Sequence, residues 1–492
     1  MINEDLLFSA VGDLGTLLKT RQISPVELTE AYLSRLERLG PTLNAVVTVT
    51  RQLAIEQARQ AEQEIRARRY RGPLHGIPYG AKDLVATRGI PTTWGAAPYR
   101  DQVFDYDATC IRRLRDAGAV LVAKLAMVEL AGGFGYNNPD ASFTGPGRNP
   151  WNLGFWSGGS SSGPASAVPT ALVGFAIGSE TGGSILLPAA YCGLSGFRPT
   201  FGLVSRHGAM ALSWTLDKLG PMCRTAHDCG LVLAAIAGAD PADPFSAGRG
   251  FEYPRTRRRR AKRVRLGVPE GMLDRAEPDV QRAFADALTV LARDADIVSN
   301  VALPQFPPMM GLILRAESAS ALGELIASGR SRELTNPRDR LGGYVNTATL
   351  AVDYLDAMRV RMAMKHSYAS VWKTCDALIA PTMNGVATPI DANFGAGGGT
   401  TRGGPPAPPR LSLLQIGNLL GVPGLAFMNG LDRQGLPTSM QVVGPAWSDG
   451  DLVEIGKAYQ QATDWHTRRP ALREASAVAA GATVDVPWED RV

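Results

Sequence analysis

Apolar residues in the first 70 positions recur at the three-to-four-residue spacing of amphipathic helices. Ser24, followed by Pro25 and Glu27, is typical of a helix start. Ser24 would be the N-cap, Pro25 would occupy the first turn, and Glu27 would complete a capping box. A second helix, rich in Ala, Glu and Arg, is expected on the surface over residues 53–69. The pattern predicts an N-terminal helical layer over residues 1–70.

Beyond this layer, short apolar runs alternate with helix-like segments. Residues 76–83 combine a short strand with turn residues, residues 110–117 have a helical pattern, and residues 119–123 and 264–269 are typical of strands. This alternation predicts an α/β protein, with helices packed on a sheet. Residues 132–208 are dense in Gly, Ser and Pro, and a long irregular segment inside a compact domain is usually functional.

Composition and charge exclude several protein classes. The chain has 492 residues, 45% hydrophobic and 20% charged, as in ordinary globular proteins. Its net charge of +5 depends on a run of eight basic residues within 255–265; without that run the charge would be −3. A general attraction to nucleic acid is therefore not supported. We interpret the run as a solvated linker, with a nuclear-localisation or nucleic-acid patch as the alternative. Residues 393–410, rich in Gly and Pro, form either a connector or a lid.

Cysteines, histidines and termini give further expectations. The five cysteines contain no CxxC pair, and the five histidines show no metal-ligand spacing, so neither a disulfide framework nor a metal site is expected. The N-terminus lacks the basic region of a signal peptide. The longest apolar stretch, residues 165–178, is shorter than the ~18–20 residues that span a bilayer. We expect a cytoplasmic protein.

A lysine and two glycine-flanked serines form the strongest chemical candidate. They are Lys82 in GIPYGAKDL, Ser160 in SGGSSSG and Ser184 in GSETGGSILLPAAYCG. A serine hydroxyl needs a base to become a nucleophile, and burial can make lysine that base because it disfavours the charged amine. Lowering its pKa from ~10.4 to ~7.5 corresponds to about 4 kcal/mol. The glycine-rich run 180–184 offers successive N–H groups that could bind an oxyanion.

A second arrangement is possible in the same region. Residues 159–163 formally match G-x-S-x-G, the nucleophile elbow of α/β-hydrolases, with Ser161 as the nucleophile. That mechanism would need a histidine and an acid downstream, and no downstream histidine has a recognisable context. The residues alone leave both arrangements open.

Taken together, these motifs resemble the amidase signature family over essentially the whole chain. GPLHGIPYGAKDL is similar to the family's lysine segment. GPGRNPWN, SGGSSSGPASAV and GSETGGSILLPAAYCGLSGFRPTFG follow in the family's order, with 24 residues from Ser160 to Ser184. The resemblance is weakest over about 245–375.

The resemblance implies one α/β/α domain over residues 1–492, with a mixed twisted sheet covered by helices on both faces. The N-terminal layer would be followed by the signature core at 72–235. A variable, substrate-side region at 245–410 would include the 393–410 loop, and residues 411–492 would return to the core.

It also implies roles for individual residues. Ser184 would be the acylated nucleophile, Ser160 would follow a cis peptide bond and relay protons, and Lys82 would be the base. Backbone N–H groups of Thr181, Gly182, Gly183 and Ser184 would form the oxyanion hole. Water would then cleave the acyl-enzyme, and no metal or organic cofactor is implied. The neighbouring Asp83 would oppose a neutral Lys82 unless it points to the other face of a strand.

The residues after the predicted nucleophile limit the class of substrate that we expect. Relatives often carry an arginine in the pair that follows Ser184-Ile185, where this chain has Leu186 and Leu187. A carboxylate close to the scissile bond would find no obvious partner, so we predict neutral, fairly apolar amides, or carbamates (urethanes). The candidate substrate-pocket residues are Met127, Gly133, Phe134, Tyr136 and Leu187.

We therefore predict a stand-alone amidase for a small-molecule amide or carbamate. It would be a monomer or homodimer, with neither a nucleic acid nor a membrane as partner. The main alternative is the glutaminase (A-type) subunit of a tRNA-dependent amidotransferase, which shares the fold and triad and passes ammonia to a partner. The Leu186-Leu187 pair and the tail ending in DWHTRRP argue against that alternative. A nucleic-acid-binding protein using residues 255–265, or a hydrolase centred on Ser161, are the further alternatives.

Overall fold

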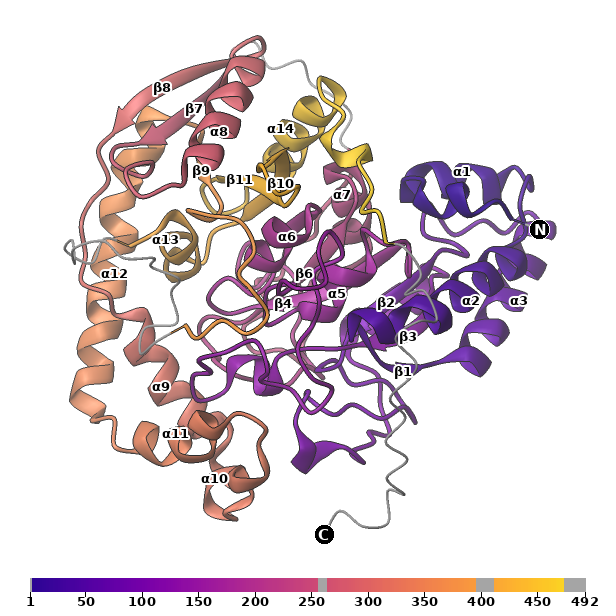
Figure 1. The fold of residues 1–492 in the computed structure, drawn as a ribbon, viewed down its shortest axis with the longest axis horizontal. Coiled ribbons are helices and arrows are strands. Elements are labelled where there is room, and N and C mark those ends of the chain that lie inside the picture. Colours follow the sequence, from indigo (N-terminus) through magenta and orange to yellow (C-terminus); the bar gives the residue numbers. More distant parts are fainter. Residues whose placement is uncertain (1, 255–262, 395–410, 473–492) are drawn as a thin grey trace.

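A computed structural model describes residues 2–254, 263–394 and 411–472. The described strands form one mixed, 11-stranded sheet (Figure 1). In order across the sheet they are β1 (Val46–Val49), β3 (Val120–Leu125), β2 (Pro78–Lys82), β4 (Phe175–Glu180), β6 (Lys218–Cys223), β5 (Ser195–Arg198), β10 (Gly424–Leu431), β11 (Pro437–Val443), β9 (Ala377–Pro381), β7 (Val264–Pro269) and β8 (Ala295–Val301).

Parallel pairs lie on either side of an antiparallel middle, and the edge strand β1 pairs antiparallel with β3. β2 runs parallel to β3 and β4, and β7 runs parallel to β8 and β9. Antiparallel pairing joins β4 to β6, β6 to β5, β5 to β10, β10 to β11, and β11 to β9. The mixed sheet agrees with the expected fold class.

Helices cover both faces of the sheet (Figure 1). They are α1 (Val11–Lys19), α2 (Pro25–Leu43), α3 (Arg51–Arg66), α4 (Thr109–Asp116), α5 (Ser162–Ala167), α6 (Leu186–Cys192), α7 (Ala226–Ile236), α8 (Pro278–Leu291), α9 (Met310–Ala321), α10 (Gly323–Ala327), α11 (Pro337–Thr347), α12 (Ala351–Thr374), α13 (Leu413–Leu420) and α14 (Asp449–Gln461). Successive side chains of β10 point to opposite faces of the sheet. Leu425 and Phe427 pack in the core formed with α7, α8 and α14. Ala426 packs in the core formed with α6 on the other face.

Local predictions agree with the observed elements where the pattern is strong. Ser24 caps α2 by accepting hydrogen bonds from the N–H groups of Val26 and Glu27. The predicted strand over 264–269 is β7, and the predicted helices and strand over 53–69, 110–117 and 119–123 correspond to α3, α4 and β3 within a few residues.

Two local predictions need correction. The N-terminal layer is not wholly helical, because the β-branched run Val46–Val49 forms β1 and pairs with β3. Residues 132–208 are not one irregular segment, since they contain α5, β4, α6 and β5. β4 is buried on both faces, so it lacks the alternating pattern that marks a half-exposed strand.

The predictions for the basic run and for the Gly/Pro-rich loop fall largely on residues that the structure does not describe. Residues 255–262 of the basic run and residues 395–410 of the Gly/Pro-rich loop lie beyond the described ranges. Within the described ranges, no helix combines the length and the apolar character needed to cross a bilayer. A cytoplasmic location stays a prediction.

Candidate active site

Lys82 ends β2 in the interior of the molecule. All five residues of β2 are buried, and the Lys82 side chain is fully buried. Its Nζ donates hydrogen bonds to Ser160 Oγ at 2.7 Å and to Ser179 Oγ at 2.8 Å. The structure therefore brings Lys82 and Ser160, two of the predicted catalytic residues, into direct contact.

The surroundings of Lys82 favour its neutral form. Burial lowers the pKa of Lys82 well below the ordinary lysine value, because a charged amine loses its hydration there. Attraction to Asp217 and Glu180 acts in the opposite direction but does not outweigh burial. A neutral amine has a lone pair, so the 2.7 Å contact can also carry the Ser160 hydroxyl proton toward Nζ.

Asp83, the residue after Lys82, does not oppose the neutral form of Lys82. Its carboxylate points away from the Ser160 contact, lies 3.1 Å from Lys124 Nζ and accepts a hydrogen bond from the Thr93 N–H. Lys124 is itself fully buried on β3. Successive residues at a strand end therefore face opposite sides, as the sequence suggested, and a second lysine compensates the acid.

The Ser160 segment is tightly packed against its neighbours. The peptide bond between Gly159 and Ser160 is cis, as the resemblance implied. A Cβ on Gly159 would lie 2.7 Å from the Val128 side chain and 2.8 Å from the Trp156 ring, so this position requires glycine. Ser161 N–H donates to the Ser184 carbonyl at 3.3 Å, which places the two predicted serine segments side by side.

Ser161 is held by the neighbouring strand. Its hydroxyl is buried, donates to the Ser179 carbonyl at 3.2 Å and accepts from the Ser179 N–H at 3.4 Å. A nucleophile elbow presents its hydroxyl to the substrate. The contacts of Ser161 instead tie the Ser160 segment to β4, whereas Ser184 is partly exposed.

A carboxylate closes the turn that contains Ser184. Glu180 Oε2 accepts hydrogen bonds from the N–H groups of Ile185 and Leu186, each at 2.9 Å. Its Oε1 accepts from Arg198 at 2.9 Å and from Asn418 at 2.8 Å. Burial alone would raise the pKa of Glu180, but Arg198 and Lys218 outweigh burial and hold it below the usual value. Glu180 therefore stays charged, and it ties the end of the turn at Ile185 and Leu186 to Arg198 and Asn418.

A second acid holds the start of the predicted oxyanion segment. Asp217 Oδ1 accepts a hydrogen bond from Thr181 Oγ1 at 2.6 Å, and Oδ2 accepts from the N–H groups of Leu212 and Ser213. Thr181 and Gly183 are buried, while Gly182 and Ser184 are partly exposed. The segment from Thr181 to Ser184 is thus fixed in shape while part of its surface remains accessible.

Sequence reasoning missed Ser179 and Asp217. Ser179 contacts Lys82 because β2 and β4 pair in parallel, with Ala81 opposite Ile177. That register is a long-range feature that the residues do not reveal. Asp217 lies next to β6, which pairs with β4 from the other side. Its only sequence signal is an acid immediately before a strand.

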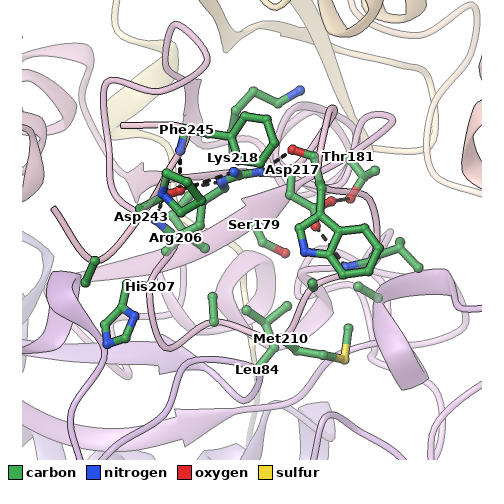
Figure 2. A pocket seen from close by; sticks show the side chains of 18 residues that line it. Leu84, Ser179, Thr181, Arg206, His207, Met210, Asp217, Lys218, Asp243 and Phe245 are labelled. Atoms are coloured by element: carbon green, nitrogen blue, oxygen red, sulfur yellow. Dashed lines mark hydrogen bonds and ion pairs between the residues drawn. The ribbon is translucent and has the colours of Figure 1, made fainter. Parts of the chain in front are cut away.

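A cavity of about 180 Å³ adjoins this site (Figure 2). Ser179, Thr181, Asp217 and Lys218 line its polar part. Its apolar lining residues are Leu84, Ala131, Ala209, Met210, Ala211, Leu212, Trp214, Leu219, Ala242, Pro244 and Phe245.

The main charges at the cavity are already engaged by protein groups. Arg206 pairs with Asp243 and stacks on the Phe201 and Phe245 rings. Lys218 Nζ donates to Asn418 Oδ1 at 2.7 Å. The cavity therefore suits a small uncharged group; an apolar cavity of about 150 Å³ can hold benzene.

The predicted pocket residues lie elsewhere. None of the five lines this cavity. Met127 packs on Gly95, Gly133 on Leu130, Phe134 on two glycines of α11, and Leu187 on Gly158. Tyr136 joins an aromatic cluster with Trp156 and Phe394. Their role in substrate binding stays a prediction.

Ser160→Ala should leave the fold intact. It removes the hydroxyl that contacts Lys82 Nζ, and because Ser160 is the predicted proton relay, we expect kcat to fall by about 10²–10⁴-fold. The measurement is steady-state turnover together with thermal unfolding. Turnover within a few-fold of wild type would remove Ser160 from the proton path.

Known proteins share this architecture. The family described as Amidase matches residues 27–453. The chain is 35% identical to the A-type subunit of the glutamyl-tRNA(Gln) amidotransferase of Methylococcus capsulatus, over 94% of this chain and 98% of that protein. Among solved structures, it resembles the native peptide amidase from Stenotrophomonas maltophilia, with TM-score 0.81 and 31% identity, covering 94% and 98% of the two chains. It also resembles the A-type subunit of the Thermotoga maritima glutamyl-tRNA(Gln) amidotransferase, with TM-score 0.76 and 26% identity, covering 94% and 97%.

Proposed function

This chain belongs to the amidase signature family, and from that premise we propose that it hydrolyses an amide C–N bond through an acyl-enzyme on Ser184. One observation above all supports this proposal. The buried Lys82 amine lies 2.7 Å from Ser160 Oγ, in surroundings that favour its neutral form. A neutral lysine in that position can accept a proton through Ser160.

In the first half-reaction, Ser184 Oγ attacks the amide carbonyl carbon. Its proton passes to Ser160, whose own proton passes to Lys82 Nζ. The carbonyl oxygen becomes an oxyanion facing the N–H groups of the segment from Thr181 to Ser184. The C–N bond then breaks, and the proton held on Lys82 returns through Ser160 to the leaving nitrogen.

In the second half-reaction, water replaces the amine. It attacks the acyl carbonyl while its proton follows the same path to Lys82, and the Ser184 ester bond breaks as that proton returns to Ser184 Oγ. The products are a carboxylic acid and an amine, and the enzyme regains its starting state. An O-aryl carbamate would differ in the bond that breaks: its C–O bond is cleaved, an aminocarbonyl group stays on Ser184, and the proton held on Lys82 passes through Ser160 to the leaving phenol.

The proposal predicts how activity depends on pH. Lys82 must be neutral to accept the proton, and burial lowers its pKa, so kcat/KM should rise with pH and then reach a plateau from neutral to alkaline pH. Protonation of Lys82 should lower activity about tenfold per pH unit on the acid side. A profile measured with an uncharged substrate that stays flat down to pH 5 would contradict a lysine base.

We propose a neutral amide with a small apolar group as the substrate class. The apolar part of the cavity beside Thr181 supports this, as do the paired states of Arg206 and Lys218. A free carboxylate or ammonium group there would lose hydration, while Arg206 and Lys218 are already engaged by other protein groups. Leu187, which is partly exposed in the turn after Ser184, supports the same class, whereas Leu186 is buried in the core.

The A-type subunit of a tRNA-dependent amidotransferase is the second candidate, and the curated relatives favour it over the stand-alone amidase. Relatives with that name are 34–36% identical to nearly the whole chain. Under this candidate the substrate is glutamine and the product ammonia passes to a partner. Since the relatives' names include a tRNA, they do not support the expectation that no nucleic acid is involved.

Hydrolysis of four compounds by the purified full chain tests these candidates. We would compare an anilide, a primary aliphatic amide, glutamine and an aryl carbamate by kcat/KM, with Ser184→Ala as control. Preference for the anilide or carbamate supports the apolar class. Preference for glutamine, with ammonia released in a 1:1 ratio to glutamate, would contradict the apolar substrate class and support the A-type subunit instead.

A further inference from the structure

Glu129 and Asp339 are buried acids that neither half-reaction uses. Both side chains are fully shielded from water. Glu129 begins a short 3-10 helix that ends at Gly132, and Asp339 lies in the first turn of α11. A buried carboxylate is costly unless it is paired with a charge or hydrogen-bonded. The contacts of the two acids therefore show how the fold tolerates them.

Each acid binds the backbone of the segment that carries the other acid. The two oxygens of Glu129 accept hydrogen bonds from the N–H groups of Thr335 and Asn336, each at 2.9 Å, immediately before α11. Asp339 Oδ1 accepts a hydrogen bond from the N–H of Phe134, a candidate pocket residue, at 3.1 Å. The two segments are therefore joined from both sides.

The two carboxyl groups also hydrogen-bond to each other. Two ionised carboxylates have no proton to donate, so one member of the pair must be protonated. Both oxygens of Glu129 already accept backbone N–H groups, whereas Asp339 Oδ2 has no donor in the part of the chain that the structure describes. Asp339 is therefore the member that carries the proton and donates it to Glu129.

The groups around the pair favour this assignment. Burial is the main cause that raises the pKa of Asp339, and the negative charge of Glu129 raises it further. The positive charge of Arg338 acts in the opposite direction but does not outweigh them. Burial also raises the pKa of Glu129, although its two backbone N–H donors partly counter that effect. The nearby phenol of Tyr136 adds no charge, because burial raises its own pKa.

The segment over residues 128–134 connects the pair to the candidate site. The Val128 N–H donates to the carbonyl oxygen of Ser160 at 3.1 Å, and Ala131 lines the cavity. Leu130 and Ala131 have φ values of 50° and 57°, a left-handed conformation that non-glycine residues rarely adopt. Such a conformation persists only where the surrounding contacts hold it, and the acid pair supplies contacts of that kind.

We propose that Glu129 and Asp339 are positioning residues, which share one proton and hold the segment 128–134 against Ser160 and the cavity. They act through the backbone of this segment and not on the reacting atoms. Their effect on rate rests on the proposed amide hydrolysis. The shared proton and the order of the segment do not depend on that proposal.

Hydrogen–deuterium exchange of the full chain, followed on peptides that cover 128–134, tests the positioning role without a substrate. Asp339→Leu keeps the branched shape of the side chain but loses both of its hydrogen bonds, so the segment should exchange at least about tenfold faster. Asp339→Asn keeps an acceptor for the Phe134 N–H and a donor for Glu129, so it should retain the protection. Asp286→Asn, on the exposed side of α8, is the matched control and should exchange as the wild type does.

Glu129→Gln identifies which acid carries the proton. A glutamine places an amide nitrogen against the N–H of Thr335 or Asn336, so one of these donors loses its acceptor. The segment 128–134 should then exchange faster, as in Asp339→Leu. The opposite result, in which Glu129→Gln is tolerated and Asp339→Asn is not, would overturn the assignment.

The pH dependence of stability is an independent test of the shared proton. Because the pKa of Asp339 is raised in the folded protein, the wild type must take up a proton on folding once the pH exceeds the ordinary aspartate pKa of about 4. The stability that this proton contributes is complete below that pH and is lost as the pH rises to the raised pKa. Asparagine needs no proton, so the thermal midpoint of Asp339→Asn should exceed that of the wild type by a margin that widens from about pH 5 upward. A margin that does not change with pH would contradict a shared proton.

Turnover of whichever test compound the wild type hydrolyses completes the experiment. We expect kcat/KM to fall about tenfold or more in Asp339→Leu and Glu129→Gln, and to stay within about threefold of the wild type in Asp339→Asn. Faster exchange with unchanged turnover would overturn the positioning role, and unchanged exchange over 128–134 in both disruptive variants would overturn the whole inference. If no compound is hydrolysed, the proposed function fails, while exchange and the pH dependence of stability still decide whether the pair shares a proton and orders the segment.

Discussion

Lys82→Met is expected to lower kcat by about 10⁴-fold while the protein remains folded. Methionine fills a similar volume, but its thioether sulfur is not basic enough to take a proton from the Ser160 hydroxyl, which lies 2.7 Å from Lys82 Nζ in the wild type, so the proton of the nucleophile has no acceptor. Two hydrogen bonds, to Ser160 and Ser179, are lost, and we expect a stability change within about 2 kcal/mol. The measurements are single-turnover rate and thermal unfolding. The residual activity should also lose its dependence on pH on the acid side.

Lys124→Met is the control for Lys82→Met, because it removes a second buried lysine that does not contact Ser160. Lys124 is equally buried on the adjacent strand, but its amine lies 3.1 Å from Asp83. Removing it leaves a buried carboxylate without its partner, which should cost about 3–5 kcal/mol of stability. The fall of kcat/KM at acid pH should still be seen in the fraction of Lys124→Met that stays folded. Equal losses of kcat in both variants at equal stability would show that Lys82 acts through structure and not as a base.

Ser184→Ala is expected to have the largest effect, a loss of about 10⁴–10⁶-fold in kcat, because it removes the oxygen that forms the acyl-enzyme. The substitution removes only one partly exposed hydroxyl, and the contacts that hold its turn come from Glu180 and remain. Thermal unfolding should therefore be near that of the wild type. Substrate affinity, measured by binding of uncleaved substrate to the variant, should be retained.

Ser161→Ala is the matched control for this variant. It removes a hydroxyl that bonds to the Ser179 backbone, which we expect to cost about 1–2 kcal/mol of stability and less than tenfold in rate. Activity that survives Ser184→Ala but disappears with Ser161→Ala would contradict the account and support the hydrolase centred on Ser161.

Local elements could be predicted from the sequence because their signals are local. The Ser24 cap, the helix at Thr109–Asp116 and the strand at Val264–Pro269 each depend on a few adjacent residues. The order of strands across the sheet could not be predicted, because it depends on contacts between residues far apart in the chain. β10, for example, lies between β5 and β11, and Leu425 pairs with Phe197.

The same limit applies to the candidate site. The motifs identified Lys82 and Ser160, and the fold brings them into contact across 78 residues of chain. The motifs did not indicate Ser179 as the second partner of Lys82, nor Asp217 as the acid that holds Thr181. The cavity was also unpredictable, because its wall combines residues from Leu84 to Phe245 that share no motif.

Intact-protein mass spectrometry tests the central claim most directly. Wild type and Ser184→Ala would be incubated with the anilide, the aliphatic amide, glutamine and the aryl carbamate, then quenched in acid during turnover. The account predicts a mass increment equal to the acyl or aminocarbonyl group on wild type only, located by peptide mapping on Ser184. An increment that persists in Ser184→Ala, or one that maps to Ser161, would contradict it.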